Sequence, residues 1–560
     1  MAKRIHLVLL LLAGSLSTAC STAESPQLVL TGGTIHTLEP EQPVAEALAV
    51  RDGRIVAVGD DTDVLQLIGE GTQVIDLEGA VVYPGFTDSH VHLRGVGERE
   101  LAFNLEGISG ISELQERLAA EVAKRQPGDW ILGRGWIETH WQPSRFPTRE
   151  DLDVVAPNNP VALTRADGHA LVANSRALEI AGIGPDTQAP FGGEILRDDN
   201  GKPTGMLVDN AMDLLADVMP ESDIAPRQAL VTGAERSARL GWTGLQIAGN
   251  DWEEAMLLRD LVKEGAIPVR IYNAIRGPSP SARQLLESGA RIAESDGRFT
   301  LRTIKVSVDG ALGSRGAALL EEYADADTTG LITWREEDLL PLYESALREG
   351  IQVETHAIGD RANRFVLDLY EKVFAAVPER ERKVHPPRWR IEHAQVLAES
   401  DIPRFAELGV IPSMQASHAI GDLHFAPDRL GEERLSGAYA WRRLRDTGVI
   451  IPGGSDAPVE QGDPRIEYYA MVARRDLSGE QGENWHPEQA LSREEALLSL
   501  TAWPAYAAFE EDTRGSIAVG KRADFTILGK DITRIPEAEI PSTAIVMTIV
   551  GGRIVYRGDD

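Results

Sequence analysis

Short hydrophobic runs alternate with amphipathic segments through the middle of the chain. The runs lie at residues 81–87, 242–248, 267–275, 301–307, 351–356, 388–393, 408–414 and 448–454. Between most of them lie helix-like segments such as 338–349, 362–376 and 399–408. Strands that alternate with helices predict a parallel sheet, and eight of them fit a closed, TIM-like (β/α)8 barrel of the α/β class. The gap at about 94–240 is too long for one helix, so we expect an insertion there.

The two chain ends carry a different pattern. Residues 27–80 contain short apolar stretches separated by Gly-Gly and Asp-Gly pairs, and residues 510–560 repeat this arrangement. Such spacing is typical of β-hairpins. Because neither end could bury a sufficient core alone, we expect one small β-sandwich domain built from both termini, beside a barrel domain at 81–509.

The first residues predict export. Two cationic residues precede an apolar run over 5–13, and the small residues 17–19 lead to Cys20. The run is shorter than the roughly 20 residues of a membrane-spanning helix, so residues 1–19 have the layout of a signal peptide. The position of Cys20 resembles a bacterial lipoprotein cleavage site. We expect lipid anchoring at Cys20, in the outer membrane and facing the periplasm; the alternative is a cleaved signal with an incidental cysteine.

Composition narrows the range of partners. Cys20 is the only cysteine of 560 residues, so the exported chain would form no internal disulfide. The net charge of −31 argues against nucleic acid and against direct adhesion to anionic lipid. We therefore expect no nucleic-acid partner, and membrane contact only through the lipid anchor; the charge itself says little about the substrate.

A pair of histidines ends the first hydrophobic run. His90 and His92 follow Thr87-Asp88-Ser89 and are separated by one residue. On a strand, positions i and i+2 point the same way, so both imidazoles could reach one metal ion. Taken alone, this pattern is a weak indication of a metal site.

Four more polar residues stand in or at the ends of later runs: Lys305, His356, His393 and Asp456. In a barrel, the carboxyl ends of different strands converge on one site. Each residue also has a structural interpretation, as a hydrogen-bonded core histidine, a salt-bridged lysine or a helix-capping aspartate. The full set of six, in this order at strand ends, favours one shared metal site.

The order His-x-His, Lys, His, His, Asp resembles the amidohydrolase superfamily. Several stretches are similar to amidohydrolase family 3, which includes N-substituted formamide deformylase-like enzymes. These stretches are Gly133-Arg134-Gly135-Trp136, Asp167-Gly168-His169-Ala170, the segment 309–315, His356-Ala357-Ile358-Gly359-Asp360 and Gly454-Ser455-Asp456-Ala457-Pro458. Together with 515–525, the resemblance covers about residues 27–556.

The resemblance implies a zinc centre of one or two ions, with two favoured. One ion would be held by His90, His92 and Asp456, the other by His356 and His393, with Lys305 bridging them after carboxylation by CO2. A mononuclear site with unmodified Lys305 is the alternative.

The resemblance also implies a reaction. Hydroxide activated by the metal would attack the carbonyl of a small substrate and cleave a C–N, amide-type bond other than a peptide bond. Asp456 would take the proton and deliver it to the leaving amine. Two alternatives stay open: an ester or lactone hydrolase on the same metal site, and a non-catalytic binding lipoprotein. A homodimer is the oligomeric state that the superfamily suggests.

Three further residues are candidate substrate contacts. His169 lies in the insertion, where a hydrogen bond within its own loop explains it equally well. Arg315 could hold a substrate carboxylate, but pairing with Asp309 or Glu321 is favoured. His418 follows the seventh hydrophobic run and could stabilise the oxyanion of a tetrahedral intermediate.

Overall fold

The structure is a computed structural model that describes residues 25–220, 224–479, 482 and 485–558. The leader predicted at residues 1–19, and the lipidation site predicted at Cys20, lie outside these residues. Among the helices of the described ranges, none is both long and apolar enough to cross a membrane.

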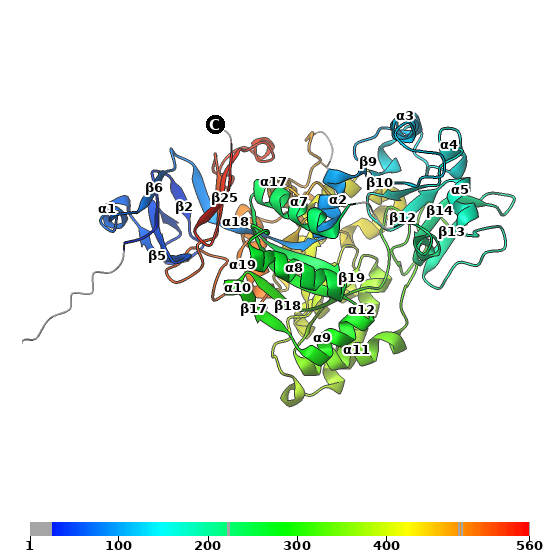
Figure 1. The fold of residues 1–560 in the computed structure, drawn as a ribbon. Helices are drawn as coiled ribbons and strands as arrows, with labels where there is room; N and C mark the ends of the chain where they lie inside the picture. Colours follow the sequence, from blue (N-terminus) through cyan, green and yellow to red (C-terminus); the bar gives the residue numbers. More distant parts are fainter. Residues whose placement is uncertain (1–24, 221–223, 480–481, 483–484, 559–560) are drawn as a thin grey trace, which may run out of the picture.

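Eight parallel strands form a nearly closed barrel at the centre of the molecule (Figure 1). The strands are β8 (Phe86–Val91), β15 (Trp242–Asn250), β16 (Arg270–Arg276), β18 (Phe299–Ser307), β19 (Gln352–Ala357), β20 (Arg390–His393), β21 (Ile411–Gln415) and β22 (Gly453–Gly454). The last strand lies against the first, and glycine permits this approach: a Cβ on Gly454 would lie 2.5 Å from the backbone nitrogen of His90. The predicted α/β barrel is thus confirmed.

The first hydrophobic run contributes to two sheets rather than one. β7 (Val81–Pro84) pairs with β2 (Thr34–His36) and with β23 (Phe525–Leu528) in a sheet outside the barrel. Gly85 separates β7 from β8, and a side chain there would collide with Thr243. The structure therefore differs from the single strand predicted over 81–87. The prediction missed the break because apolar residues continue through the point where the chain passes from one sheet to the other.

Strands from both chain ends form two sheets beside the barrel (Figure 1, blue and red). The four-stranded sheet has the order β5–β4–β1–β6, from strands Arg54–Gly59, Ala47–Arg51, Leu28–Thr31 and Gln73–Asp76. The six-stranded sheet has the order β25–β24–β23–β7–β2–β3, where β25, β24 and β3 are Arg553–Arg557, Ile545–Val550 and Val44–Ala45. One hydrophobic cluster contains Leu30, Val82 and Ile527 from both ends. That this part is a separate sandwich domain stays a prediction.

The long segment between β8 and β15 forms a sheet of its own, at the opposite end of the molecule from the terminal strands (Figure 1). Its order is β13–β14–β12–β11–β10–β9, from Gly193–Arg197, Pro203–Asp209, Ala170–Ala173, Val161–Arg165, Ile131–Trp136 and Phe103–Asn104. Buried residues on one side of it include Trp136 and Trp141. This sheet occupies the region where the insertion was predicted.

Two closely packed helices connect the insertion to the barrel. α2 (Leu93–Leu101) follows β8, and α7 (Pro226–Arg239) precedes β15. A side chain on Gly97 would collide with the carbonyl of Ala229, so glycine at this position lets the helices approach each other. Their contact fixes the insertion over the mouth of the barrel.

Candidate functional site

The six residues predicted to form a metal centre line a single cavity of about 610 Å³. Three lie within strands: His90 on β8, Lys305 on β18 and His356 on β19. The other three stand at or just beyond strand ends: His393 ends β20, His92 follows β8, and Asp456 follows β22. The cavity is therefore built at the carboxyl edge of the barrel, as expected for this architecture.

Asp456 lies against both histidines of the first strand. Its Oδ1 is 3.4 Å from Nε2 of His90 and 3.2 Å from Nε2 of His92. The three ligand atoms lie within 4.8 Å of one another, a grouping that could hold a metal ion. Burial alone would raise the pKa of Asp456, but the histidines hold it well below its usual range. The carboxyl group is therefore ionised and can act as a ligand or a base.

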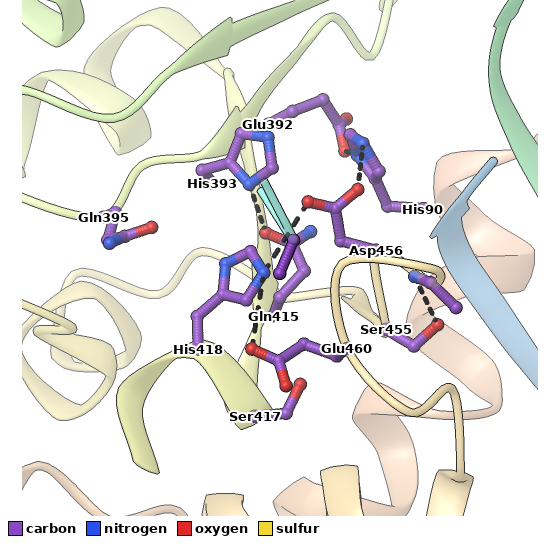
Figure 2. A network of polar contacts seen from close by, with 12 residues as sticks. His90, Glu392, His393, Gln395, Gln415, Ser417, His418, Ser455, Asp456 and Glu460 are labelled. Atoms are coloured by element: carbon purple, nitrogen blue, oxygen red, sulfur yellow. Dashed lines mark hydrogen bonds and ion pairs between the residues drawn. The ribbon is translucent and has the colours of Figure 1, made fainter. Parts of the chain in front are cut away.

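A buried carboxylate orients His90. Nδ1 of His90 is 2.5 Å from Oε2 of Glu392 (Figure 2). Nε of Arg390 donates to the other oxygen of Glu392 at 2.6 Å. Burial, with the nearby charge of Lys305, lowers the pKa of His90 to about 4. A neutral ring that donates through Nδ1 presents the lone pair of Nε2 to the cavity, as metal-binding histidines do.

A second group gathers around His393. Its Nδ1 is 2.6 Å from Oε1 of Gln415, which directs Nε2 into the cavity. His393, His418 and Asp456 also lie within 4.8 Å of one another through their ligand atoms (Figure 2). The ring of His356 is 4.4 Å from that of His393, but Nε2 of His356 faces Asp309 at 3.3 Å. The structure thus brings the predicted pair together and adds His418 to it.

Several buried atoms in this cavity and in the one that adjoins it have no hydrogen-bond partner. They are Nε2 of His356, Nε2 of His418 and Oδ1 of Asp456. Buried polar atoms are nearly always satisfied, and these three belong to residue types that commonly bind metals. Nitrogen and carboxylate donors in this number fit zinc, which prefers such ligands. The residues present therefore fit the divalent metal that the sequence predicts.

Lys305 is buried beside these ligands. Its Nζ is 3.2 Å from Nε2 of His90, and no carboxylate of the described residues forms an ion pair with it. Burial lowers the pKa of the amine, against the opposing charges of Glu354 and Glu392. The lysine therefore lacks the partner that a permanent buried cation would need.

The three candidate substrate contacts have different surroundings. His169 lines the cavity, and its Nδ1 is 2.7 Å from Oδ1 of Asp209. Burial alone would lower the pKa of His169, but Asp209 raises it to about 9, so the ring is a cation at neutral pH. Nε2 of His418 lies 3.6 Å from Oδ2 of Asp456. Arg315 does not line the cavity and pairs instead with Asp325, 2.8 Å away.

Some residues of the site were not found from the sequence. Asp88 accepts hydrogen bonds from the backbone nitrogens of Ser455 and His90, and so joins the first and last strands. Burial raises the pKa of Asp88 to about 7. Glu460 lies 3.9 Å from Nε2 of His418, and both line an adjoining cavity of about 200 Å³. For Asp88, its position two residues before His90 was an available signal.

Comparisons with known proteins cover nearly the whole chain. The family model described as Amidohydrolase family matches residues 73–556. Protein LONG AFTER FAR-RED 3 of Arabidopsis thaliana is 35% identical, over 94% of this chain and 91% of that protein. N-substituted formamide deformylase of Arthrobacter pascens is 30% identical, over 94% of this chain and 98% of that protein. A metal-dependent hydrolase of Pyrococcus horikoshii OT3 superposes with a TM-score of 0.72 and 26% identity, over 92% of this chain and 99% of that one.

Proposed function

This chain belongs to the amidohydrolase family, and we propose that it is a zinc-dependent hydrolase that cleaves a C–N, amide-type bond of a small substrate. The observation that carries the proposal is the single cavity where neutral histidine nitrogens and the ionised Asp456 meet. The similarity to N-substituted formamide deformylase favours an amide bond other than a peptide bond.

The proposed centre takes one or two zinc ions, with two favoured. The ligands of one would be His90, His92 and Asp456, and those of the other His393 with His356 or His418. Lys305 would bridge them after its neutral amine adds to CO2, which forms an N–C bond and releases one proton. Bound zinc lowers the pKa of a water ligand from 15.7 toward about 7 and polarises a substrate carbonyl.

Asp456 is the group that moves the proton in this proposal. Its carboxylate accepts the proton of the attacking water and then donates it to the nitrogen that leaves. His418, which lies 3.6 Å from Oδ2 of Asp456, would donate a hydrogen bond to the negative charge that develops on the substrate oxygen. The insertion contributes Asp167, Gly168 and His169 to the wall of the same cavity.

Two other functions are compatible with the same site. An ester or lactone hydrolase would use the same ligands, since the fold alone does not fix the scissile bond. A binding protein without catalysis has less support, because all six polar residues are present and line one cavity. Buried polar groups without partners cost about 1–3 kcal/mol each, so a binding protein would have little reason to keep them.

The test combines elemental analysis with a matched substrate pair. Wild type is expected to hold close to two zinc equivalents and to hydrolyse an N-acyl amine faster than the ester of the same shape. Lys305→Ala is expected to lose metal and activity together, whereas Lys372→Ala, an exposed lysine that pairs with Glu336, serves as control. Faster hydrolysis of the ester, or metal-loaded protein without turnover, would contradict the proposal.

We also propose that the chain is exported and anchored through a lipid on Cys20, in the outer membrane facing the periplasm, and that it forms a homodimer. Cells that express the full chain should incorporate labelled fatty acid into it, and Cys20→Ala should abolish the label and release the protein. Unchanged labelling in Cys20→Ala would contradict the anchor. Analytical ultracentrifugation of the released protein tests the dimer.

A further inference from the structure

Arg134 presents a cation to the cavity without a carboxylate partner. It lies on β10 of the insertion and lines the same cavity as the six strand-end residues. Its Nη2 donates to the carbonyl of Ala166 at 2.9 Å, while its buried Nε has no hydrogen-bond partner. Among the described residues, no carboxylate lies within ion-pair distance of it. An enclosed guanidinium without a counterion destabilises the folded protein, and an anion that binds to it removes this cost.

The other arginines of the cavity differ from Arg134. Arg94 is neutralised, because its Nε lies 2.7 Å from Glu98 and its Nη1 lies 3.1 Å from Glu254. Arg276 is exposed at the end of β16 and needs no counterion, because water solvates it. Arg134 is therefore the arginine of this cavity that is both largely enclosed and without an ion pair.

The acidic neighbours of Arg134 are already engaged. Asp167 forms an ion pair with Arg165, whose guanidinium also binds Glu138. Asp456 lies among the histidines. Gly168 lies beside Arg134, since a Cβ there would make ordinary van der Waals contact with Nη2 at 3.5 Å. The guanidinium therefore lines the cavity together with the strand-end residues, and none of these acidic neighbours forms an ion pair with it.

We propose that Arg134 binds a carboxylate of the substrate, so that the preferred substrate is an anionic amide such as an N-acyl amino acid. This inference rests on the proposed amide hydrolysis and specifies its substrate class. A guanidinium binds a carboxylate through two parallel hydrogen bonds, which fixes orientation as well as charge. In a chain of net charge −31, an anionic substrate needs such a local cation.

The kinetic test compares N-acetylphenylalanine with its carboxamide on the metal-loaded enzyme. For Arg134→Met, KM for the carboxylate substrate should rise roughly 10- to 100-fold, as expected for lost charge-assisted hydrogen bonds. The value of kcat, and KM for the carboxamide, should change little. Arg134→Lys should recover part of the loss, and Arg176→Met, an exposed arginine of the insertion that pairs with Glu179, should match wild type. Equal losses of kcat on both substrates would overturn the inference.

A binding measurement separates this inference from the proposed function. The metal-loaded protein is titrated calorimetrically with 3-phenylpropanoate and with the neutral 3-phenylpropanol. Tighter binding of the acid that is lost in Arg134→Met supports the carboxylate site even if no amide is hydrolysed, an outcome in which the proposed function alone fails. Binding of the acid that is unchanged in Arg134→Met overturns the inference even if amides are hydrolysed, because the anion then binds the metal or another group.

Discussion

The backbone nitrogen of Asp456 donates a hydrogen bond to the carbonyl oxygen of His90, with 2.7 Å between the two atoms. This bond joins the residue after the last barrel strand to the first strand, and both residues are candidate metal ligands. Asp456 adopts a backbone φ of +54°, which turns its carboxylate toward the imidazoles. Closure of the barrel and placement of the ligands are therefore achieved by the same contact.

The first prediction concerns the support of His90. Glu392→Gln keeps an oxygen for Nδ1 of His90 but removes the charge that makes the imidazole a stronger ligand. Zinc affinity should fall roughly 10-fold, since partners of metal ligands typically contribute 10- to 100-fold. Competition with a chelator, followed by elemental analysis, measures the change. Glu349→Gln, which loses only a surface pair with Lys383, is the control; equal affinity in all three proteins would contradict the role of Glu392.

The second prediction concerns Lys305. Carboxylation needs CO2, so metal reconstitution of chelator-treated protein should give more active enzyme with bicarbonate than in CO2-depleted buffer. Protein reconstituted with ¹³C-bicarbonate should show a carbamate signal in its ¹³C spectrum. Lys305→Ala should lack that signal, and Lys372→Ala should keep it. A wild-type spectrum without the signal, together with full activity in CO2-depleted buffer, would favour the unmodified lysine.

The third prediction is a pH dependence of stability. Asp209 raises the pKa of His169 to about 9, above the ordinary value of 6.5, so the folded state holds this proton more tightly. The stabilisation is full below pH 6.5 and is lost as pH rises through 9, and it amounts to the order of 2 kcal/mol. Urea unfolding should therefore show His169→Gln less stable than wild type at pH 6, with the difference shrinking by pH 9.5. A difference that grows with pH would contradict the ion pair.

The fourth prediction concerns the contact between α2 and α7. Gly97→Ala places a methyl group against the carbonyl of Ala229, so the helices must separate. Overpacking of this kind costs about 1–3 kcal/mol, and the melting temperature should fall. Gly184→Ala is the control, because nothing lies within 4 Å of its added Cβ. Activity should fall more in Gly97→Ala than stability alone explains, since the helices hold the insertion over the cavity.

The barrel and the residues at its strand ends could be predicted from the sequence, because both follow from the succession of short hydrophobic and amphipathic segments along the chain. Amphipathic segments separate most of the eight hydrophobic runs, and these runs contain or adjoin Lys305, His356, His393 and Asp456. Because the carboxyl ends of parallel barrel strands all lie at one edge of the barrel, these positions come together there. The boundary at Gly85 was missed because the hydrophobic run continues through it from one sheet to the next.

Other features depend on contacts between distant segments. The grouping of His418 with His393 arises where α14 (Ala416–Asp422) follows β21, and no periodicity indicates which face of so short a helix meets the cavity. Arg134 lies in Gly133-Arg134-Gly135-Trp136, one of the stretches that resemble the family. That it lacks an ion pair can be recognised only when the positions of the surrounding carboxylates are known. Arg315 pairs with Asp325 and not with the two partners considered from the sequence.

The sheet shared by the chain ends has a consequence for the order of folding. Val82 pairs with Ile527, so β7 remains an open edge through the synthesis of more than four hundred intervening residues. Pairings this distant in sequence form slowly, because the loop-closure entropy is lost before the contact is gained. The barrel strands from β15 to β22 follow one another at shorter intervals along the chain and can associate earlier. The nascent protein would therefore carry an exposed, aggregation-prone strand edge until its last segment emerges.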